Sequence, residues 1–111
     1  MTIQLDASKW QTYFDQFSKD LPTELVEIEV ASLGLGDQIV ADWVPLKSIS
    51  YDPKDHILVV RTEAIDHMIQ SPSEIHIEED PEGIQYIVVM GPQGEKQIIQ
   101  FKHVLKLPRE A

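Results

Sequence analysis

The chain has 111 residues, of which 42% are hydrophobic and 25% charged, the balance of an ordinary globular protein rather than of a disordered one. We therefore expect a single domain over residues 1–111, large enough to fold around its own core. The absence of cysteine excludes disulfides and zinc sites built from thiolates. A formal net charge of -10 argues against nucleic acids and anionic membranes as partners, because an acidic surface repels phosphate groups.

The N-terminal sequence MTIQLDASKW lacks the basic and apolar regions of a secretory signal. No stretch of the chain approaches the ~18 apolar residues of a membrane span. The sequence thus predicts a soluble, cytoplasmic protein.

Residues 96–111 depart from the acidic composition, because they contain Lys96, Lys102, Lys106 and Arg109. We expect these cations to pair with the protein's own acidic strands, and docking of an anionic partner is the alternative. The acidic residues expected to pair with Lys102 and Lys106 are Glu27, Glu29, Glu74 and Glu78.

The first element is an amphipathic helix predicted over residues 8–20, with an apolar stripe at helical spacing made of Trp10, Phe14, Phe17 and Leu21. Ser8 and Gln11 match a capping box at its start, and Pro22 ends it. We expect the aromatic stripe to pack in the core. A face for a partner or a membrane is the alternative, although the few cations of this helix fit anionic lipid poorly.

From residue 24 the apolar period changes to two, and ELVEIEVAS is predicted to be a strand with one solvent-exposed face. Gly34 and Gly36 can supply the positive φ angles of a hairpin loop that leads into a second strand, QIVADW. A phosphate-binding loop is the weaker reading of these glycines, because it needs a third glycine and a following helix.

Pro45 places a bend, a bulge or an edge before the strand-like residues 46–51. Further strand-like runs follow, namely HILVVRT, EIHIEE, IQYIVVM and KQIIQFKHVLKL. Between the first two of these runs, we expect residues 63–73 to form an ordered loop at a sheet end. The predicted fold class is α+β: an N-terminal amphipathic helix packed on a bent antiparallel sheet of about five to seven strands, or a sheet closing toward a small barrel.

The stretch YDPKDHI could be read as a metal site or as a turn. Asp52 followed by Pro53 favours a type I turn, since the Asp side chain accepts backbone N–H groups and proline fixes φ. A calcium loop needs acids at alternating positions and a central glycine, and zinc needs three or four ligands. We therefore predict a turn, and neither a metal nor another cofactor.

Two histidines need an explanation of their own. His67 lies among apolar residues and would need a hydrogen-bond partner if buried, so we expect it to make a structural hydrogen bond. His76 alternates with Glu74 and Glu78, which is typical of a solvated strand face. An active site would have to gather groups from several strands, and the candidate polar cluster for it is Asp52, Asp55, Asp66, His67 and His76.

Four blocks of the sequence, WQTYFD, LGDQIVADWVPL, YDPKDHI and DHMIQSPSEI, resemble in the same order the patterns W..YFD, LG.Q...W.PL, YDP.DD and DH.I..P.EI. These patterns belong to a family of small bacterial proteins known only as a domain of unknown function. The resemblance covers most of the chain, and it departs at His56, where the family usually has a second acid. It implies a bacterial, single-domain protein and brings with it no activity, cofactor or substrate.

No nucleophile elbow, Walker loop or His-Glu metal helix is present in the sequence. The first functional hypothesis is therefore a non-enzymatic interaction module, self-associating or binding a protein partner, that uses a sheet edge or the aromatic helix face. The alternative is a small hydrolase or metal-dependent enzyme built on the candidate polar cluster.

Overall fold

The structure is a computed structural model, and it describes residues 1–106. It contains one α-helix, α1 (Trp10–Lys19), preceded by a short 3-10 helix, η1 (Ala7–Lys9), and eight strands in this part of the chain. The strands are β1 (Thr2–Gln4), β2 (Leu25–Ser32), β3 (Gly36–Asp52), β4 (Ile57–Thr62), β5 (Asp66–Gln70), β6 (Glu74–Asp80), β7 (Gly83–Met90) and β8 (Lys96–Leu105).

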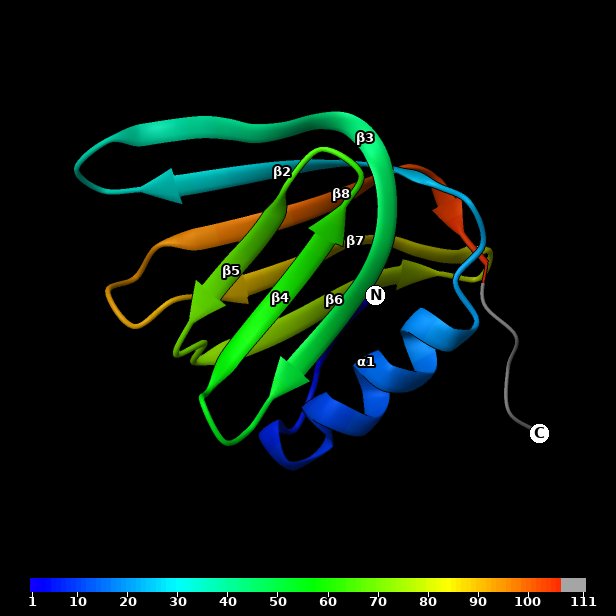
Figure 1. The fold of residues 1–111 in the computed structure, drawn as a ribbon, viewed down its shortest axis with the longest axis horizontal. Helices are drawn as coiled ribbons and strands as arrows, with labels where there is room; N and C mark the ends of the chain where they lie inside the picture. Colours follow the sequence, from blue (N-terminus) through cyan, green and yellow to red (C-terminus); the bar gives the residue numbers. More distant parts are fainter. Residues whose placement is uncertain (107–111) are drawn as a thin grey trace.

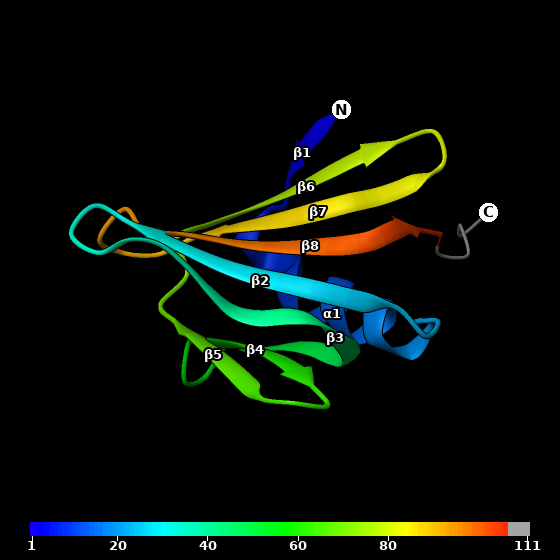
Figure 2. The same ribbon diagram turned by 90° about the horizontal axis from the view of Figure 1, so that it is seen from above.

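All strands join one antiparallel sheet in the order β1-β6-β7-β8-β2-β3-β4-β5. The 17-residue strand β3 pairs with β2 through its first part and with β4 through its last part, and it bends between the two. We call β1, β6, β7, β8, β2 and the first part of β3 the large half, and the end of β3 with β4 and β5 the small half. The bend folds the small half over one face of the large half (Figures 1 and 2).

The bend in β3 has a local cause. The pairing of β2 with β3 shifts register on both sides of Ile28, and Trp43 has a φ of 52°, a left-handed conformation that is rare for a bulky residue. Extra residues of this kind are β-bulges, which increase the bend and twist of a strand. The expected bend near Pro45 is confirmed, but the two strands predicted on either side of it are one continuous strand.

The helix α1 packs against β3 and closes the open side between the two halves (Figure 1). Trp10, Phe14 and Phe17 are buried, and the Trp10 ring meets that of Tyr51 edge-on with centroids 5.1 Å apart. Ser18 Oγ donates to Ile49 O (2.6 Å) and accepts from Ile49 N–H (2.9 Å), which fixes the helix to the edge of the bend. The predicted core role of the aromatic stripe is confirmed.

The predicted capping box is wrong. Asp6, not Ser8, caps the start, because Asp6 Oδ1 accepts the backbone N–H of Ser8 at 2.9 Å and its hydroxyl at 2.8 Å. The chain thus enters the helix through the 3-10 turn η1, and α1 itself begins at Trp10. Acidic and hydroxyl side chains both suit this position, so a pattern of spacing alone did not separate them.

Three further expectations about the sheet are wrong. The described part of the chain has eight strands rather than five to seven, and the sheet is open, with β1 and β5 as its edges, rather than closed into a barrel. Within residues 63–73, the predicted loop contains β5, whose register with β4 pairs Val59 with Met68. Strand β5 has a single β-branched residue, Ile69, so its strand conformation comes from pairing with β4 rather than from propensity.

Candidate functional site

The large half has an inner and an outer face, because side chains alternate along each strand. The inner face fills the core with residues such as Ile77, Ile87 and Ile99. The outer face points away from α1 and from the small half, and no described helix covers it (Figure 2). The half-buried apolar side chains of this face come from β7 and β8 and are Tyr86, Val88, Met90 and Ile98.

Three adjoining hollows, with cavity volumes of about 230, 270 and 350 Å³, mark this face. All three share Lys96 as a lining residue. Tyr86 and Val88 lie in two of them, next to Ile98 in the largest. The outer face is therefore an uneven, largely apolar surface of neighbouring strands, and Lys96 at the start of β8 is the cation that lines its hollows.

Carboxylates surround the apolar residues of the outer face. Glu27 and Glu29 lie on β2, Asp37 on β3, and Glu74 and Glu78 on β6. A hydrogen bond shared with the Asp37 carboxyl raises the pKa of Glu29 above its usual range, and the nearby charge of Glu27 adds to this effect. Glu27, Glu29 and Asp37 thus form a group of neighbouring carboxyls along this border.

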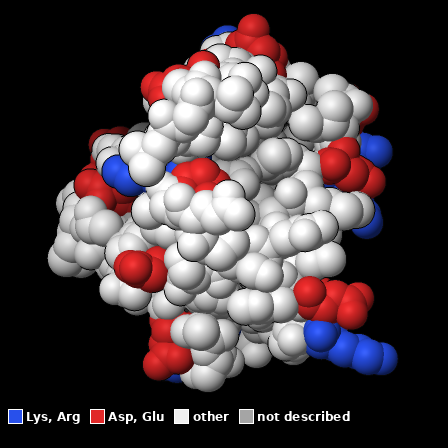
Figure 3. Space-filling model, turned by 90° about the vertical axis from the view of Figure 1, so that its left-hand side faces the viewer, with Lys and Arg blue, Asp and Glu red and all other residues white. Residues whose placement is uncertain are grey.

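The hairpin that joins β2 to β3 extends the outer face at one end of the molecule. Leu33 and Leu35 at its turn are 97% and 76% exposed, and Ile39, opposite Glu29 on the outer face, is 51% exposed. Figure 3 shows this end of the molecule, where uncharged atoms dominate and acidic groups lie around them. Exposed large apolar side chains gathered in one place are typical of a surface that contacts another molecule.

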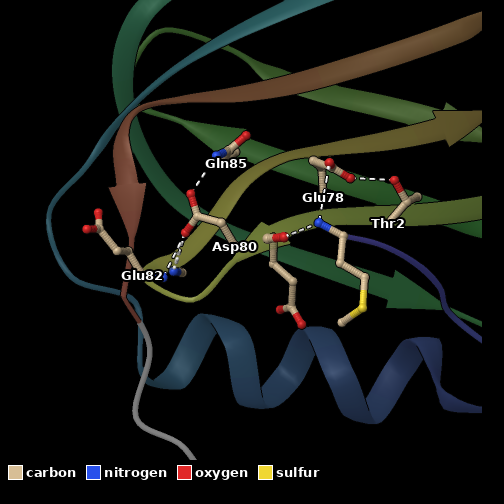
Figure 4. A network of polar contacts seen from close by, with 8 residues as sticks. Thr2, Glu78, Asp80, Glu82 and Gln85 are labelled. Atoms are coloured by element: carbon tan, nitrogen blue, oxygen red, sulfur yellow. Dashed lines mark hydrogen bonds and ion pairs between the residues drawn. The ribbon is translucent and has the colours of Figure 1, made fainter.

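The opposite border of the outer face is held by polar contacts of β1 and β6 (Figure 4). The Thr2 hydroxyl donates to the Glu78 carboxylate, which also ion-pairs with the Met1 ammonium at 3.6 Å. In the turn after β6, Asp80 Oδ1 accepts the N–H groups of Glu82 and Gly83. The hydrogen bond from the Gln85 amide, followed by those from the backbone, lowers the pKa of Asp80. These contacts join β1 to β6 and close the turn after β6.

The five candidate residues from the sequence lie in three different places. Asp52 and Asp55 share the β3–β4 turn, where Asp52 Oδ1 accepts the N–H groups of Lys54 (2.9 Å) and Asp55 (3.4 Å). The predicted turn at YDPKDHI is confirmed. His56 completes it with a φ of 57°, a conformation that histidine, aspartate and asparagine adopt more readily than other non-glycine residues.

The other three candidates lie on β5 and β6. Asp66 forms an ion pair with Arg61 (3.5 Å), and His76 contacts Glu74 (3.0 Å) on the outer face. His67 Nε2 hydrogen-bonds Gln97 Oε1, so its expected structural hydrogen bond is confirmed. Within residues 1–106, no group of three or more His, Asp or Glu side chains is arranged to hold a metal ion.

The basic segment differs from the expectation. Among the ion pairs between described residues, none involves Lys96, Lys102 or Lys106, and Arg109 lies outside the described residues. Lys102 instead places its ammonium 5.9 Å from the centre of the Trp43 ring. Exposed ion pairs contribute little free energy, so charge alone does not fix where a lysine side chain lies.

The outer face was missed at the sequence level, although a signal was present. In IQYIVVM the buried residues alternate with Tyr86, Val88 and Met90, so this strand is apolar on both faces. A strand that is apolar on both faces indicates that something covers each of them, as in buried sheets. Here residues 1–106, the part of the chain that the structure describes, cover only the inner one.

The comparisons with known proteins agree with the resemblance noted above. Residues 1–110 match the model of a family of unknown function, DUF5335. An uncharacterised protein of Aquifex aeolicus (strain VF5) is 37% identical over 108 residues, which cover 96% of this chain and 97% of that protein. No solved structure matches the chain.

Among residues 1–106, no helix has the length and apolar character needed to cross a membrane. The family match spans nearly the whole sequence, and the similar protein from a bacterium spans it as well. The chain therefore belongs to the DUF5335 family, a family of unknown function with a bacterial member.

Proposed function

We propose that this protein is a small, non-enzymatic interaction module that binds a partner protein on the outer face of the large half. The observation that carries the proposal is the row of half-buried apolar side chains on β7 and β8, Tyr86, Val88, Met90 and Ile98, which no described helix covers. A sheet with apolar residues on both faces is stable in water when each face packs against another layer.

The rest of the molecule narrows the choice of surface. The aromatic stripe of α1 is buried, so it is not available for docking. The outer face, in contrast, joins the exposed apolar residues of the β2–β3 hairpin into one surface. Protein interfaces combine such an apolar centre with a polar border, and the surrounding carboxylates supply that border here.

Site-specific photocrosslinking in a bacterial extract tests the proposal. A photoreactive phenylalanine analogue replaces Val88 on the outer face in one protein and Gln11, an exposed residue of α1, in the control. We expect a discrete protein adduct from position 88 only. Ile98→Ser, introduced into the protein that carries the photoreactive residue at position 88, should weaken that adduct because it removes a neighbouring apolar contact.

The control distinguishes a binding face from general stickiness. Equal adduct patterns from positions 88 and 11 would count against the outer face, as would the absence of any adduct at position 88. An adduct unaffected by Ile98→Ser would place the contact elsewhere. Thermal unfolding of each variant shows whether the fold has been kept.

A further inference from the structure

The outer face differs from the rest of the large half in the balance of its charges. Its border carries five carboxylates, whereas Lys96 is the one cation that lines its hollows. Among the ion pairs between described residues, none involves Glu27, Glu29 or Asp37. Lys96 shares one hollow with Asp37 and another with Glu29, but it forms an ion pair with neither.

We propose that the occupant of the outer face is a cationic segment of a partner protein, in which lysine or arginine side chains alternate with apolar ones. This inference rests on the proposed function and adds the chemistry of the partner. The apolar side chains of the segment contact Val88 and Ile98, and its cations reach the carboxylates of β2 and β3.

The geometry of the largest hollow fits one such cation. Glu29 lines it together with Tyr86, Val88, Lys96, Ile98 and Gln100. The stem of a lysine or arginine can pack on these apolar groups while its charged end meets the Glu29 carboxylate. Both requirements of a long cationic side chain are thus met within a cavity of about 350 Å³.

The same charges disfavour other occupants. A second copy would bring an equally acidic border against this one, and like charges facing each other across an interface cost free energy. Nucleic acids and anionic lipids are repelled by the same carboxylates. A basic protein segment is the occupant whose charge is complementary to the face.

Lys96 should limit which segments bind. It lines all three hollows, so a cation placed directly over it meets a like charge. A segment with a neutral or acidic residue at that point is favoured over one with cations throughout. The lysine is thus a specificity residue within an otherwise acidic border.

Binding of labelled peptides, followed by fluorescence anisotropy, tests the inference. The probes are extended peptides in which valine alternates with lysine, with serine or with glutamate. We expect the lysine peptide to bind most tightly and to lose affinity in high salt. Glu29→Gln should weaken its binding by about two- to fivefold, as expected for one charge pair at a surface, and Lys96→Gln should strengthen it.

Matched charge changes far from the face provide the controls. Asp15→Asn changes the net charge as Glu29→Gln does, and Lys19→Gln changes it as Lys96→Gln does, but both lie on α1. These two substitutions should leave the affinity unchanged. If these controls shift the affinity as much as Glu29→Gln and Lys96→Gln do, the attraction is general and the inference is overturned. Equal binding of the lysine, serine and glutamate peptides overturns it as well.

The crosslinking experiment separates the two proposals. If position 88 captures a partner whose crosslinked segment is neutral or acidic, the outer face is a binding surface but the inference about a cationic segment is wrong. If position 88 captures nothing that position 11 does not, the proposed function itself fails. A basic crosslinked segment supports both.

Discussion

Phe14 is the most enclosed residue of α1, with no exposed surface. Its ring meets the Tyr13 ring edge-on at 5.1 Å and lies 6.0 Å from the Phe17 ring, which in turn contacts Phe101 of β8. This chain of rings links the helix to the middle of the large half. Phe14 and Phe17 together thus connect the helix to the sheet.

Phe14→Ala should lower the free energy of unfolding by about 3–5 kcal/mol, because it removes buried apolar contacts and leaves a cavity. Chemical denaturation of the variant and of the parent measures the difference. Thr12→Ala, at an exposed position of the same helix, is the control and should change stability little. Equal losses from both substitutions would contradict core packing as the cause, since alanine raises the helix propensity at either position.

Glu29 gives a residue-scale prediction about pH. Its pKa is raised in the folded protein, mainly by the hydrogen bond to Asp37, so the protonated form is favoured by folding. The associated stability is present below the unfolded pKa of Glu29 and is lost as the pH rises through the folded pKa. Asp37→Asn should move the pKa of Glu29 down and make stability less dependent on pH in that range.

Carboxyl titrations by NMR check this prediction directly. Asp15→Asn, which removes an exposed acid on α1, should leave the titration of Glu29 where it is. An unchanged Glu29 titration in Asp37→Asn would show that the two carboxylates do not interact.

At the scale of elements, β5 is held to the large half by a polar contact as well as by apolar packing. Ile69 is buried, and His67 hydrogen-bonds Gln97 of β8, whose side chain is 9% exposed. A buried amide that has lost its hydrogen-bond partner destabilises the fold, because burial has already removed its hydrogen bonds to water. The pair therefore contributes to holding the small half against the large half.

His67→Ala and Gln97→Ala should each destabilise the fold by about 1–3 kcal/mol, because each leaves a shielded polar group unpaired. The double variant should cost less than the sum of the two, since its second substitution removes the orphaned group. Denaturation of all four proteins in a double-mutant cycle measures the coupling. Strict additivity would indicate that the two side chains act independently.

The elements with strong apolar periods could be predicted from the sequence, because burial alone determines them. The stripe of α1 and the alternation in β2, β6 and β8 are of this kind. Strand β5 could not, because DHMIQ has no clear period and forms a strand only by pairing with β4. Pairing with both of its neighbours in the sequence, β2 and β4, also made β3 one strand, since its bend depends on register shifts with β2.

The candidate residues illustrate the same limit at the site. The turn at Asp52 and the need of His67 for a partner follow from local chemistry, but the identity of Gln97 as that partner depends on how the two halves meet. The outer face was visible only as apolar residues on both sides of β7. Which side the helix covers is a property of the whole topology.

At the scale of the whole molecule, the net charge of -10 works against compactness, because like charges repel across the surface. The melting temperature should therefore rise with added sodium chloride, as the screening length falls from about 10 Å at 0.1 M to about 3 Å at 1 M. Glu27→Gln combined with Glu29→Gln should reduce the salt-dependent rise, which thermal unfolding over a salt series measures. A melting temperature that falls with salt would contradict this view.

The order of strands in the sheet also affects how the protein is made. Strand β8 lies in the middle of the large half, between β7 and β2, yet it is the last strand in the described sequence. A ribosome releases the chain from its N-terminal end, so β2 to β5 can form a consecutive meander while β6 and β7 form a separate hairpin. The backbone edges of β2 and β7 that face each other stay unpaired until residues 96–105 emerge and join them. Aggregation during synthesis should thus depend most on how soon these final residues become available.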